Sequence, residues 1–305
     1  MAVVSRRLPV RVSRRPNDAI ADRLDEIAGV LTAQRANPYR AGAYRRAAEE
    51  LRRLTVPVSE IFAAEGIAGL DRLRFIGPNL ARTIRDLIVH GYSPLLERLR
   101  GENDPIHLFM SVPGIGPGLA ARLHDELGLD TLQQLEAAAF DGRLEHIAGF
   151  GPKRLDGIRA ALAQRLGRVS TEHAASAGAE APDVSELLDV DSEYLRKARA
   201  GDLPRIAPRR FNPDAVAWLP ILHTERGARH YTALFSNTAR AHRLAKTDDW
   251  VVLYCDDGPR EHQWTVITSA FGSLRGKRIV RGREAECSAF YGLPLEAPRP
   301  IEPAG

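Results

Sequence analysis

A short apolar-Gly-Pro signal recurs three times in the first half of this chain of 305 residues. A glycine turn followed by proline at a helix start leaves backbone N–H groups unpaired at the positive end of the helix dipole. Such a corner suits a phosphate, and its repetition predicts a device that grips a polyanion at several points. We expect that polyanion to be DNA. The three copies are Ile76-Gly77-Pro78, Ile115-Gly116-Pro117 and Phe150-Gly151-Pro152.

The residues around these corners are the candidate DNA-binding site. Glycine lets the backbone approach a phosphate closely, and a neighbouring Lys or Arg adds positive charge. The predicted contacts are Gly77, Pro78, Gly114, Ile115, Gly116, Gly118, Arg122, Gly149, Gly151, Lys153 and Arg154. The alternative is that the glycines only make tight connections between packed helices. The first copy has Phe75 where the others have Gly114 and Gly149, which predicts a less tight first turn.

The charge of the chain is small and uneven. Residues 1–170 contain 25 Lys or Arg against 20 Asp or Glu, whereas residues 171–305 contain 18 against 19. A DNA-binding face therefore has to come from the arrangement of charges more than from their total. The two cysteines, Cys255 and Cys287, show no zinc-finger spacing, and no apolar run reaches the ~20 residues that a membrane helix needs. We expect a cytoplasmic protein that does not bind membranes.

The apolar pattern changes from helical to strand-like after about residue 184. We predict a multidomain protein with an all-α helix-hairpin-helix first half and a mostly antiparallel α+β second part. Short runs rich in Val, Ile, Trp, Tyr and Thr predict strands over 217–223, 230–235, 250–254, 264–268 and 278–280. The predicted boundaries are a flexible basic arm over 1–16, helical domains over 17–95 and 96–168, a linker over 169–183, and the α+β domain over 184–305.

Residues 17 to about 168 resemble the N-terminal part of family X DNA polymerases. The resemblance rests on the segments 17–28 and 37–48 and on the three Gly-Pro corners in the same order. It implies a small lyase-type helical domain with the first hairpin, followed by tandem hairpins. It also implies binding to DNA phosphates without sequence choice, at gaps, nicks or ends. A Na⁺ or K⁺ ion at the backbone carbonyls of Met110, Val112 and Ile115 is a further implication.

The chain departs from the active members of that family in three places. The lysine that forms a Schiff base in their lyase domain aligns with Thr83 here. A polymerase palm needs a Gly-Ser turn and an Asp-x-Asp pair on a strand to hold magnesium. Asp189-Val190-Asp191 imitates the pair, but no Gly-Ser precedes it and its surroundings predict a helix start. Finally, no His-x-His of the family's phosphoesterase domain occurs. We therefore assign no catalytic residue, and we favour a protein without enzymatic activity while leaving that question open.

Three functions remain in view. The leading one is a DNA-binding protein of DNA repair or maintenance that recognises backbone phosphates without sequence choice and lacks polymerase and lyase activity. One alternative is a DNA-processing enzyme, a nuclease or a polymerase-X-related protein, with its centre in the C-terminal domain. The other is a repair scaffold whose C-terminal domain binds a protein partner. The polar side chains that such a centre could use are His223, Glu225, His230, His242, Asp256, Asp257, Glu261 and His262.

Overall fold

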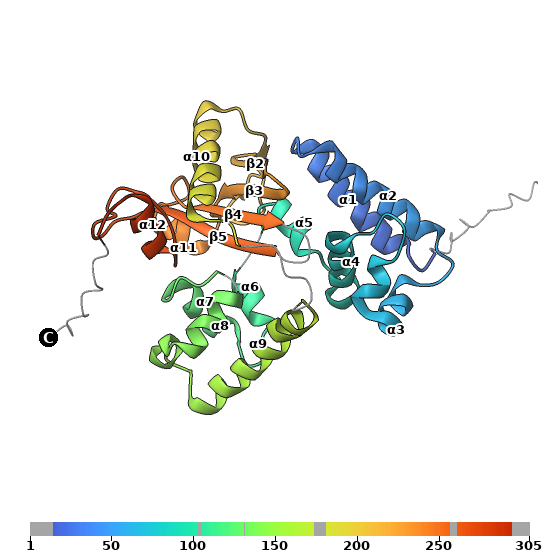
Figure 1. Cartoon of the computed structure of the whole chain (residues 1–305), viewed down its shortest axis with the longest axis horizontal. Helices are drawn as coiled ribbons and strands as arrows, with labels where there is room; N and C mark the ends of the chain where they lie inside the picture. The colour runs from blue at the N-terminus through green and yellow to red at the C-terminus, as the bar shows by residue number, and fades with distance from the viewer. Residues whose placement is uncertain (1–14, 103–104, 131, 174–180, 257–260, 295–305) are drawn as a thin grey trace, which may run out of the picture. The chain divides into compact units, whose positions relative to one another are not determined.

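The computed structural model describes residues 15–102, 105–130, 132–173, 181–256 and 261–294 (Figure 1). The chain forms two compact units, residues 1–99 and residues 100–305. Nearly all of the predicted basic arm, residues 1–14, lies outside the described residues. In the described part of the chain, no helix combines the length and the apolar character that crossing a membrane requires.

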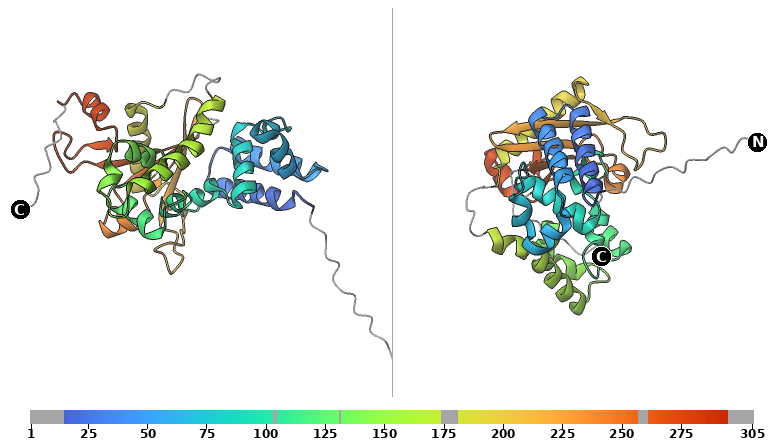
Figure 2. Two further views of the ribbon diagram at one scale, coloured as in Figure 1. Left: turned by 90° about the horizontal axis from the view of Figure 1, so that it is seen from below. Right: turned by 90° about the vertical axis from the view of Figure 1, so that its right-hand side faces the viewer.

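The first unit is helical. Its core forms where α1 and α2 pack side by side along their lengths (Figures 1 and 2). Leu24, Ile27 and Leu31 recur at helical spacing on α1 and are fully buried against Ala47 and Leu51 of α2. The helices are α1 (Asp18–Ala33), α2 (Pro38–Arg53), α3 (Val58–Asp71), α4 (Pro78–His90) and α5 (Pro94–Leu99).

The second unit begins with the tandem hairpins. Phe109, Leu123, Leu135 and Ile158 are fully buried and join its helices into one small core. The elements are α6 (Pro105–Met110), α7 (Pro117–Asp125), α8 (Leu132–Phe140), the 3₁₀ turn η1 (Arg143–His146) and α9 (Pro152–His173). The predicted linker over 169–183 is too long at its start, because α9 continues through residue 173. Adding residues to a formed helix costs little, and no proline interrupts this stretch.

A six-stranded antiparallel sheet completes the described part of the second unit, and its strand order follows the sequence from β1 to β6. This meander confirms the prediction of a mostly antiparallel α+β part. Helices α10 (Val184–Ala200) and α12 (Glu284–Phe290) contact each other and β6, and α11 (Ala239–Arg243) lies between β3 and β4 in sequence (Figure 1). The strands are β1 (Arg205–Ile206), β2 (Leu219–Arg226), β3 (Arg229–Phe235), β4 (Val251–Asp256), β5 (Glu261–Thr268) and β6 (Arg278–Val280).

Helix α10 is fixed to the sheet by its buried polar groups. The Tyr194 hydroxyl donates to the Pro220 carbonyl at 3.0 Å and accepts from the Phe235 N–H at 2.9 Å. Asp191 is only 1% exposed, and two nitrogens of the Arg278 guanidinium donate to its two oxygens at 2.6 and 2.9 Å. The Asp189-Val190-Asp191 segment is helical, as its sequence predicts, but it lies inside α10 and not at its start, because the helix begins at Val184 with Asp183 as its N-cap. Asp191 is part of a structural ion pair with Arg278.

A second ion-pair network joins the outer side of α10 to β2. Glu193 accepts hydrogen bonds from Lys197 at 2.6 Å, from Arg226 at 2.8 Å and from the Thr224 hydroxyl at 3.0 Å. Burial alone would raise the pKa of Glu193, but these three donors outweigh it and lower the pKa to about 2. The ionised carboxylate consequently stabilises the fold.

We predict that Glu193→Gln lowers the free energy of unfolding of the second unit at pH 7 by about 2 kcal/mol. Because the pKa of Glu193 is lower in the folded state, its contribution is complete above the ordinary value of 4.5 and disappears as the pH falls towards 2. Urea unfolding followed by tryptophan fluorescence at several pH values measures this, since Trp218, Trp250 and Trp264 all lie in this unit. A deficit that persists unchanged at low pH would contradict the electrostatic explanation.

Candidate nucleic-acid interface

The three hairpins share one backbone conformation. Phe75, Gly114 and Gly149 have φ values of 65°, 89° and 103°. The prediction of a less tight first turn is therefore wrong in its backbone, because Phe75 adopts the left-handed region that glycine enters freely. A non-glycine residue pays about 1–2 kcal/mol for this conformation. The surrounding hairpin thus holds Phe75 in a geometry that its own side chain disfavours.

The residue after each left-handed position anchors the turn. Ile76 and Ile115 are 4% and 5% exposed and place their side chains in the cores of their units. Their N–H groups, like that of Phe150, donate back to a carbonyl three residues earlier, and each of these bonds is 3.1 Å long. Of the predicted contacts, Ile115 can therefore reach a ligand only through its backbone. The three turns are copies of one device.

The glycine that follows begins the next helix without a side-chain cap. Gly77 and Gly116 are extended, with φ/ψ of −96°/−179° and −87°/174°, and neither α4 nor α7 has a side-chain hydrogen bond at its N-cap. Three helices of this chain are capped, since Asn37, Asp183 and Thr238 accept a backbone N–H of α2, α10 and α11, whereas α1, α3 and α12 also have no side-chain cap. The hairpin helices α4 and α7 begin with Gly-Pro, which places no long side chain over the first turn and leaves its N–H groups accessible.

The corner amides face open space. Gly116 and Gly118 are exposed, and no hydrogen bond among the described residues uses their N–H groups. A Cβ added to Gly77, Gly116, Gly118 or Gly151 would meet no atom within 4 Å. The carbonyl of Gly116 accepts the first helical bond, from Ala120 at 2.9 Å, so the helix is formed right up to the corner. Unbonded N–H groups at an exposed helix start can donate hydrogen bonds to an anion.

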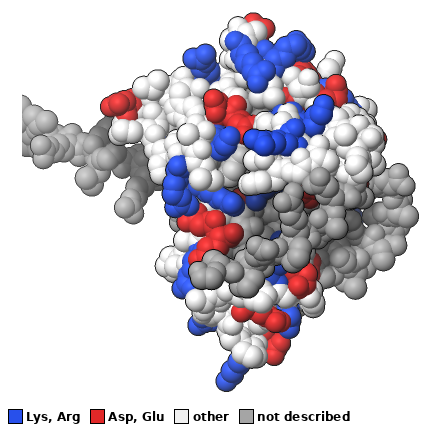
Figure 3. Space-filling view, turned by 90° about the vertical axis from the view of Figure 1, so that its left-hand side faces the viewer, with Lys and Arg blue, Asp and Glu red and all other residues white. Residues whose placement is uncertain are grey.

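The basic residues predicted beside the corners are partly used inside the tandem. The Arg122 guanidinium, from α7, donates to the Ala148 carbonyl, and the Arg154 guanidinium donates to the Gly149 carbonyl. The Arg122 bond fastens the third hairpin to the second, and the Arg154 bond closes the third hairpin on itself. An arginine has five N–H donors, so each retains donors for a phosphate. Lys153 and Arg154 are exposed. On the face shown in Figure 3, positive and negative side chains are interspersed, which agrees with the small charge excess of the sequence.

The predicted cation site lies at the turn between α6 and α7. The Val112 carbonyl accepts the Ile115 N–H at 3.1 Å, and a carbonyl oxygen keeps a second lone pair. The Val112 and Ile115 side chains are buried, which fixes the backbone around them. Binding of Na⁺ or K⁺ by the carbonyls of Met110, Val112 and Ile115 stays a prediction.

The residue that aligns with the lyase lysine, Thr83, is buried and bonded within its own helix. Thr83 is 7% exposed, and its hydroxyl donates to the Asn79 carbonyl at 3.0 Å within α4. The sequence of residues 1–99 contains no lysine, so the first unit has no side-chain amine for a Schiff base.

The sheet brings some of the polar C-terminal residues together. Glu225, His230 and Asp256 lie opposite one another on neighbouring strands, and the His230 ring is 3.0 Å from the Glu225 carboxylate. Glu261 pairs with Asp256 and so extends this row by one strand. His262 follows it in β5 and stacks on Trp264. Asp257 lies outside the described residues. Among the described residues, no group of three His, Cys, Asp or Glu has an arrangement that could hold a metal ion.

An interface between the tandem and the sheet was not foreseen from the sequence. The Asp130 carboxylate accepts the Thr265 hydroxyl at 3.2 Å and lies 3.0 Å from the His124 ring and 3.6 Å from the Arg281 guanidinium. Arg281 and Arg240 also donate to the Gly128 and His124 carbonyls, at 3.0 and 3.4 Å. Cations thus occupy the negative end of α7, opposite the glycine corner. The sheet holds the tandem while its corners stay open.

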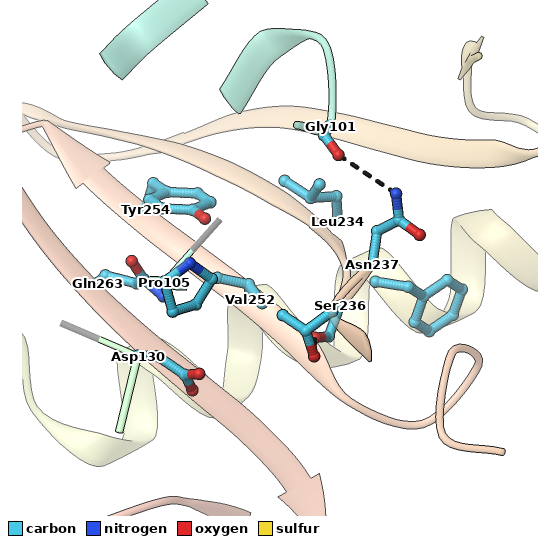
Figure 4. Close-up of a pocket in the computed structure, with 11 residues that line it drawn as sticks. Gly101, Pro105, Asp130, Leu234, Ser236, Asn237, Val252, Tyr254 and Gln263 are labelled. Atoms are coloured by element: carbon cyan, nitrogen blue, oxygen red, sulfur yellow. Dashed lines mark hydrogen bonds between the residues drawn. The ribbon is translucent and has the colours of Figure 1, made fainter. Parts of the chain in front are cut away.

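A small pocket lies beside this interface (Figure 4). Two of its polar side chains are engaged within the unit: Asn237 donates to the Gly101 carbonyl at 3.4 Å and accepts from His242 at 2.6 Å, and Asp130 binds the groups named above. The pocket is therefore part of the structural interface. It is lined by Gly101, Pro105, Asp130, Leu234, Phe235, Ser236, Asn237, Thr238, Val252, Tyr254 and Gln263.

Gly114 and Gly116 of the second hairpin allow a glycine that the fold requires to be distinguished from one that the fold does not require. We predict that Gly114→Ala lowers the free energy of unfolding by about 1 kcal/mol, because alanine is strained at positive φ. Gly116→Ala should leave stability nearly unchanged, since its φ of −87° suits any residue and the space around it is open. Urea unfolding of the two variants and the wild type measures the difference. Equal losses at both positions would contradict this assignment.

Comparisons with known proteins agree with this geometry. A helix-hairpin-helix domain model matches residues 15–93, and a SAM-like helix-hairpin-helix tandem model matches residues 106–164. The DNA polymerase/3'-5' exonuclease PolX of Bacillus subtilis (strain 168) is 27% identical over 183 residues, which are 60% of this chain and 31% of that protein. The match thus spans less than a third of that relative. The first part of this chain is a helix-hairpin-helix region similar to that of PolX.

Proposed function

We propose that this protein binds the sugar-phosphate backbone of DNA through its hairpin corners, without sequence choice. The observation that carries the proposal is the exposed Gly116 corner, where a helix begins with unbonded N–H groups and no side-chain cap. Backbone amides recognise phosphate oxygens and carry no information about the bases. The helix-hairpin-helix matches support DNA as the partner.

Two linked corners make the tandem a better phosphate clamp than one. Arg122 fastens the third hairpin to α7, so the Gly116 and Gly151 corners are held in a fixed relation. A rigid pair of sites loses less conformational entropy on binding than two independently moving sites. Lys153, exposed directly after the Gly151 corner, adds a point charge for the same backbone.

The biological role that we propose is DNA repair or maintenance in the cytoplasm, with gapped, nicked or ended duplexes as the preferred DNA. The similarity to PolX supports this role. We further propose that the chain lacks lyase and polymerase activity. Thr83 and the absence of lysine from residues 1–99 support the first statement, and the engagement of Asp191 by Arg278 supports the second. The buried free thiols of Cys255 and Cys287 suit a reducing compartment.

We predict that the double variant Gly116→Val, Gly151→Val weakens DNA binding by about tenfold or more, because the added side chains keep the phosphate away from the amides. Both positions have open space, so the fold should persist. Fluorescence anisotropy with labelled duplex DNA at fixed salt measures the affinity, and binding of the wild type should fall steeply as salt rises. The matched control is Gly157→Val, at an exposed glycine of α9 with equally open surroundings. Unchanged affinity of the double variant would argue against the corners as the binding site.

A DNA-processing activity is the second candidate, favoured by the row of Glu225, His230 and Asp256 on neighbouring strands. A histidine beside carboxylates can take up or deliver a proton. If this row is catalytic, nicked or gapped DNA incubated with the protein and Mg²⁺ should be cleaved, and Asp256→Asn should abolish the cleavage. Intact DNA with the wild type, or cleavage that survives Asp256→Asn, would remove this candidate.

A further inference from the structure

The second unit carries an exposed aromatic cluster that the hairpins do not explain. Phe211, in the loop before β2, is 50% exposed. Its ring centroid lies 4.4 Å from that of His242 on α11, with the ring planes tilted by 40°. The guanidinium carbon of Arg210 lies 5.3 Å from the Phe211 centroid. The exposed ring of Phe211 thus packs against the His242 ring on one side and has the Arg210 cation beside it.

The loop that presents Phe211 is rigidly built. Asn212 is 9% exposed, and its side chain donates to the Pro208 and Val216 carbonyls, both at 2.9 Å, and accepts the Val216 N–H at 3.0 Å. These bonds hold Phe211 at a φ of 54°, which is costly for a bulky residue. Strain of this kind persists where the surrounding structure imposes it, commonly at ligand sites. The ring is therefore held in place before any ligand arrives.

His242 is also fixed, and its ring is suited to stacking. Its Nε2 lies 2.6 Å from the Asn237 side-chain oxygen, and Trp218 approaches its ring edge-on at 6.1 Å. Burial, reinforced by the charge of Arg210, lowers the pKa of His242 below its ordinary value. At neutral pH the ring is consequently uncharged, which makes it a good support for a flat apolar partner.

The charge around the cluster indicates an anionic partner. The two segments that build it, 205–218 and 239–250, contain six Lys or Arg against three Asp, whereas residues 184–305 as a whole contain 18 against 16. The positive excess of this domain is thus concentrated here. The Arg209 side chain is 80% exposed, and its Nε lies 3.7 Å from the Glu102 carboxylate, which also accepts the Arg209 N–H at 3.3 Å. Arg243 and Lys246 pair with Asp125 and Asp249 at 2.8 and 3.3 Å.

We propose that Phe211 and His242 form a stacking platform for an unpaired base of a DNA strand, with the neighbouring arginines contacting its phosphates. The ring face accepts any base, so the site needs no sequence choice. The inference rests on the proposed function and extends it to single-stranded segments. Its position suits that role, because Arg243 of α11 pairs with Asp125 at the end of α7, and a nine-residue helix spans about 13 Å from there to the Gly116 corner.

The decisive variant is Phe211→Asn in the full-length chain. Asparagine tolerates positive φ better than phenylalanine, so this change removes the ring while relieving strain. Anisotropy titrations compare an intact duplex with the same duplex carrying a gap of a few nucleotides. We expect the variant to bind gapped DNA about tenfold more weakly and intact duplex as the wild type does. Phe211→Trp should restore gap binding, and a 2-aminopurine in the gap should be quenched only by proteins that carry an aromatic ring at this position.

The matched control is Phe290→Asn, because Phe290 has the same exposed fraction of 50% but lies on α12, whose first turn carries Glu284 and Glu286. Gap binding should survive this change. The inference is overturned if Phe211→Asn binds gapped DNA as the wild type does, if it weakens both DNAs equally, or if it changes the oligomeric mass in sedimentation. Failure of the wild type to bind either DNA would instead overturn the proposed function itself.

Discussion

An amide at the start of a helix can bond inside the protein or to a ligand, and this choice decides what the structure can do. At α2, α10 and α11 the chain closes the helix start with Asn37, Asp183 and Thr238. At α7 it does the opposite: a left-handed residue turns the chain, a buried isoleucine anchors it, and Gly-Pro opens the helix to solvent. The anchor and the free amides belong together. Without the buried Ile115, the exposed corner would have no fixed position and could not present its N–H groups as a preformed site.

The same helix is used at its other end. Arg240 and Arg281, from the sheet domain, donate to the carbonyls of His124 and Gly128, where the dipole of α7 is negative. Asp130 completes the contact by lying close to both the tandem's His124 and the sheet's Thr265. This buried polar contact has a cost in desolvation, which its several partners offset. Its geometric consequence is direct: the sheet fastens α7 at its negative C-terminal end and leaves the exposed Gly116 corner at its N-terminal end uncovered.

Sequence reasoning recovers the parts of this structure that depend on local signals. The Gly-Pro corners, five of the six strands in the described residues and the helical setting of Asp189-Val190-Asp191 follow from turn chemistry and periodicity, because each signal lies within a few residues. The two-residue β1 is too short to give such a signal. It misses the contacts made across the fold. Thr265 and Asp130 are 135 positions apart, and Arg281 and Gly128 are 153 apart, so no pattern in the chain connects them. Phe75 shows a different limit, since the hairpin imposes a left-handed turn that its residue type disfavours.

Phe75 and Phe211 are two exposed aromatic residues with an unfavourable, left-handed backbone conformation. Each follows an arginine in sequence, each has positive φ, and each is exposed, by 42% and 50%. In both cases the guanidinium lies beside the ring, at 4.5 Å for Arg74 and 5.3 Å for Arg210. Glycine would meet the backbone demand at either position without the cost. A bulky ring there contributes little to a core, so its value lies at the surface. An aromatic plane next to a cation on a rigid turn is the combination that stacks on a base and attracts its phosphate. Packing therefore does not account for the unfavourable backbone at these two turns, whereas stacking on a base, as we propose for Phe211, would account for it.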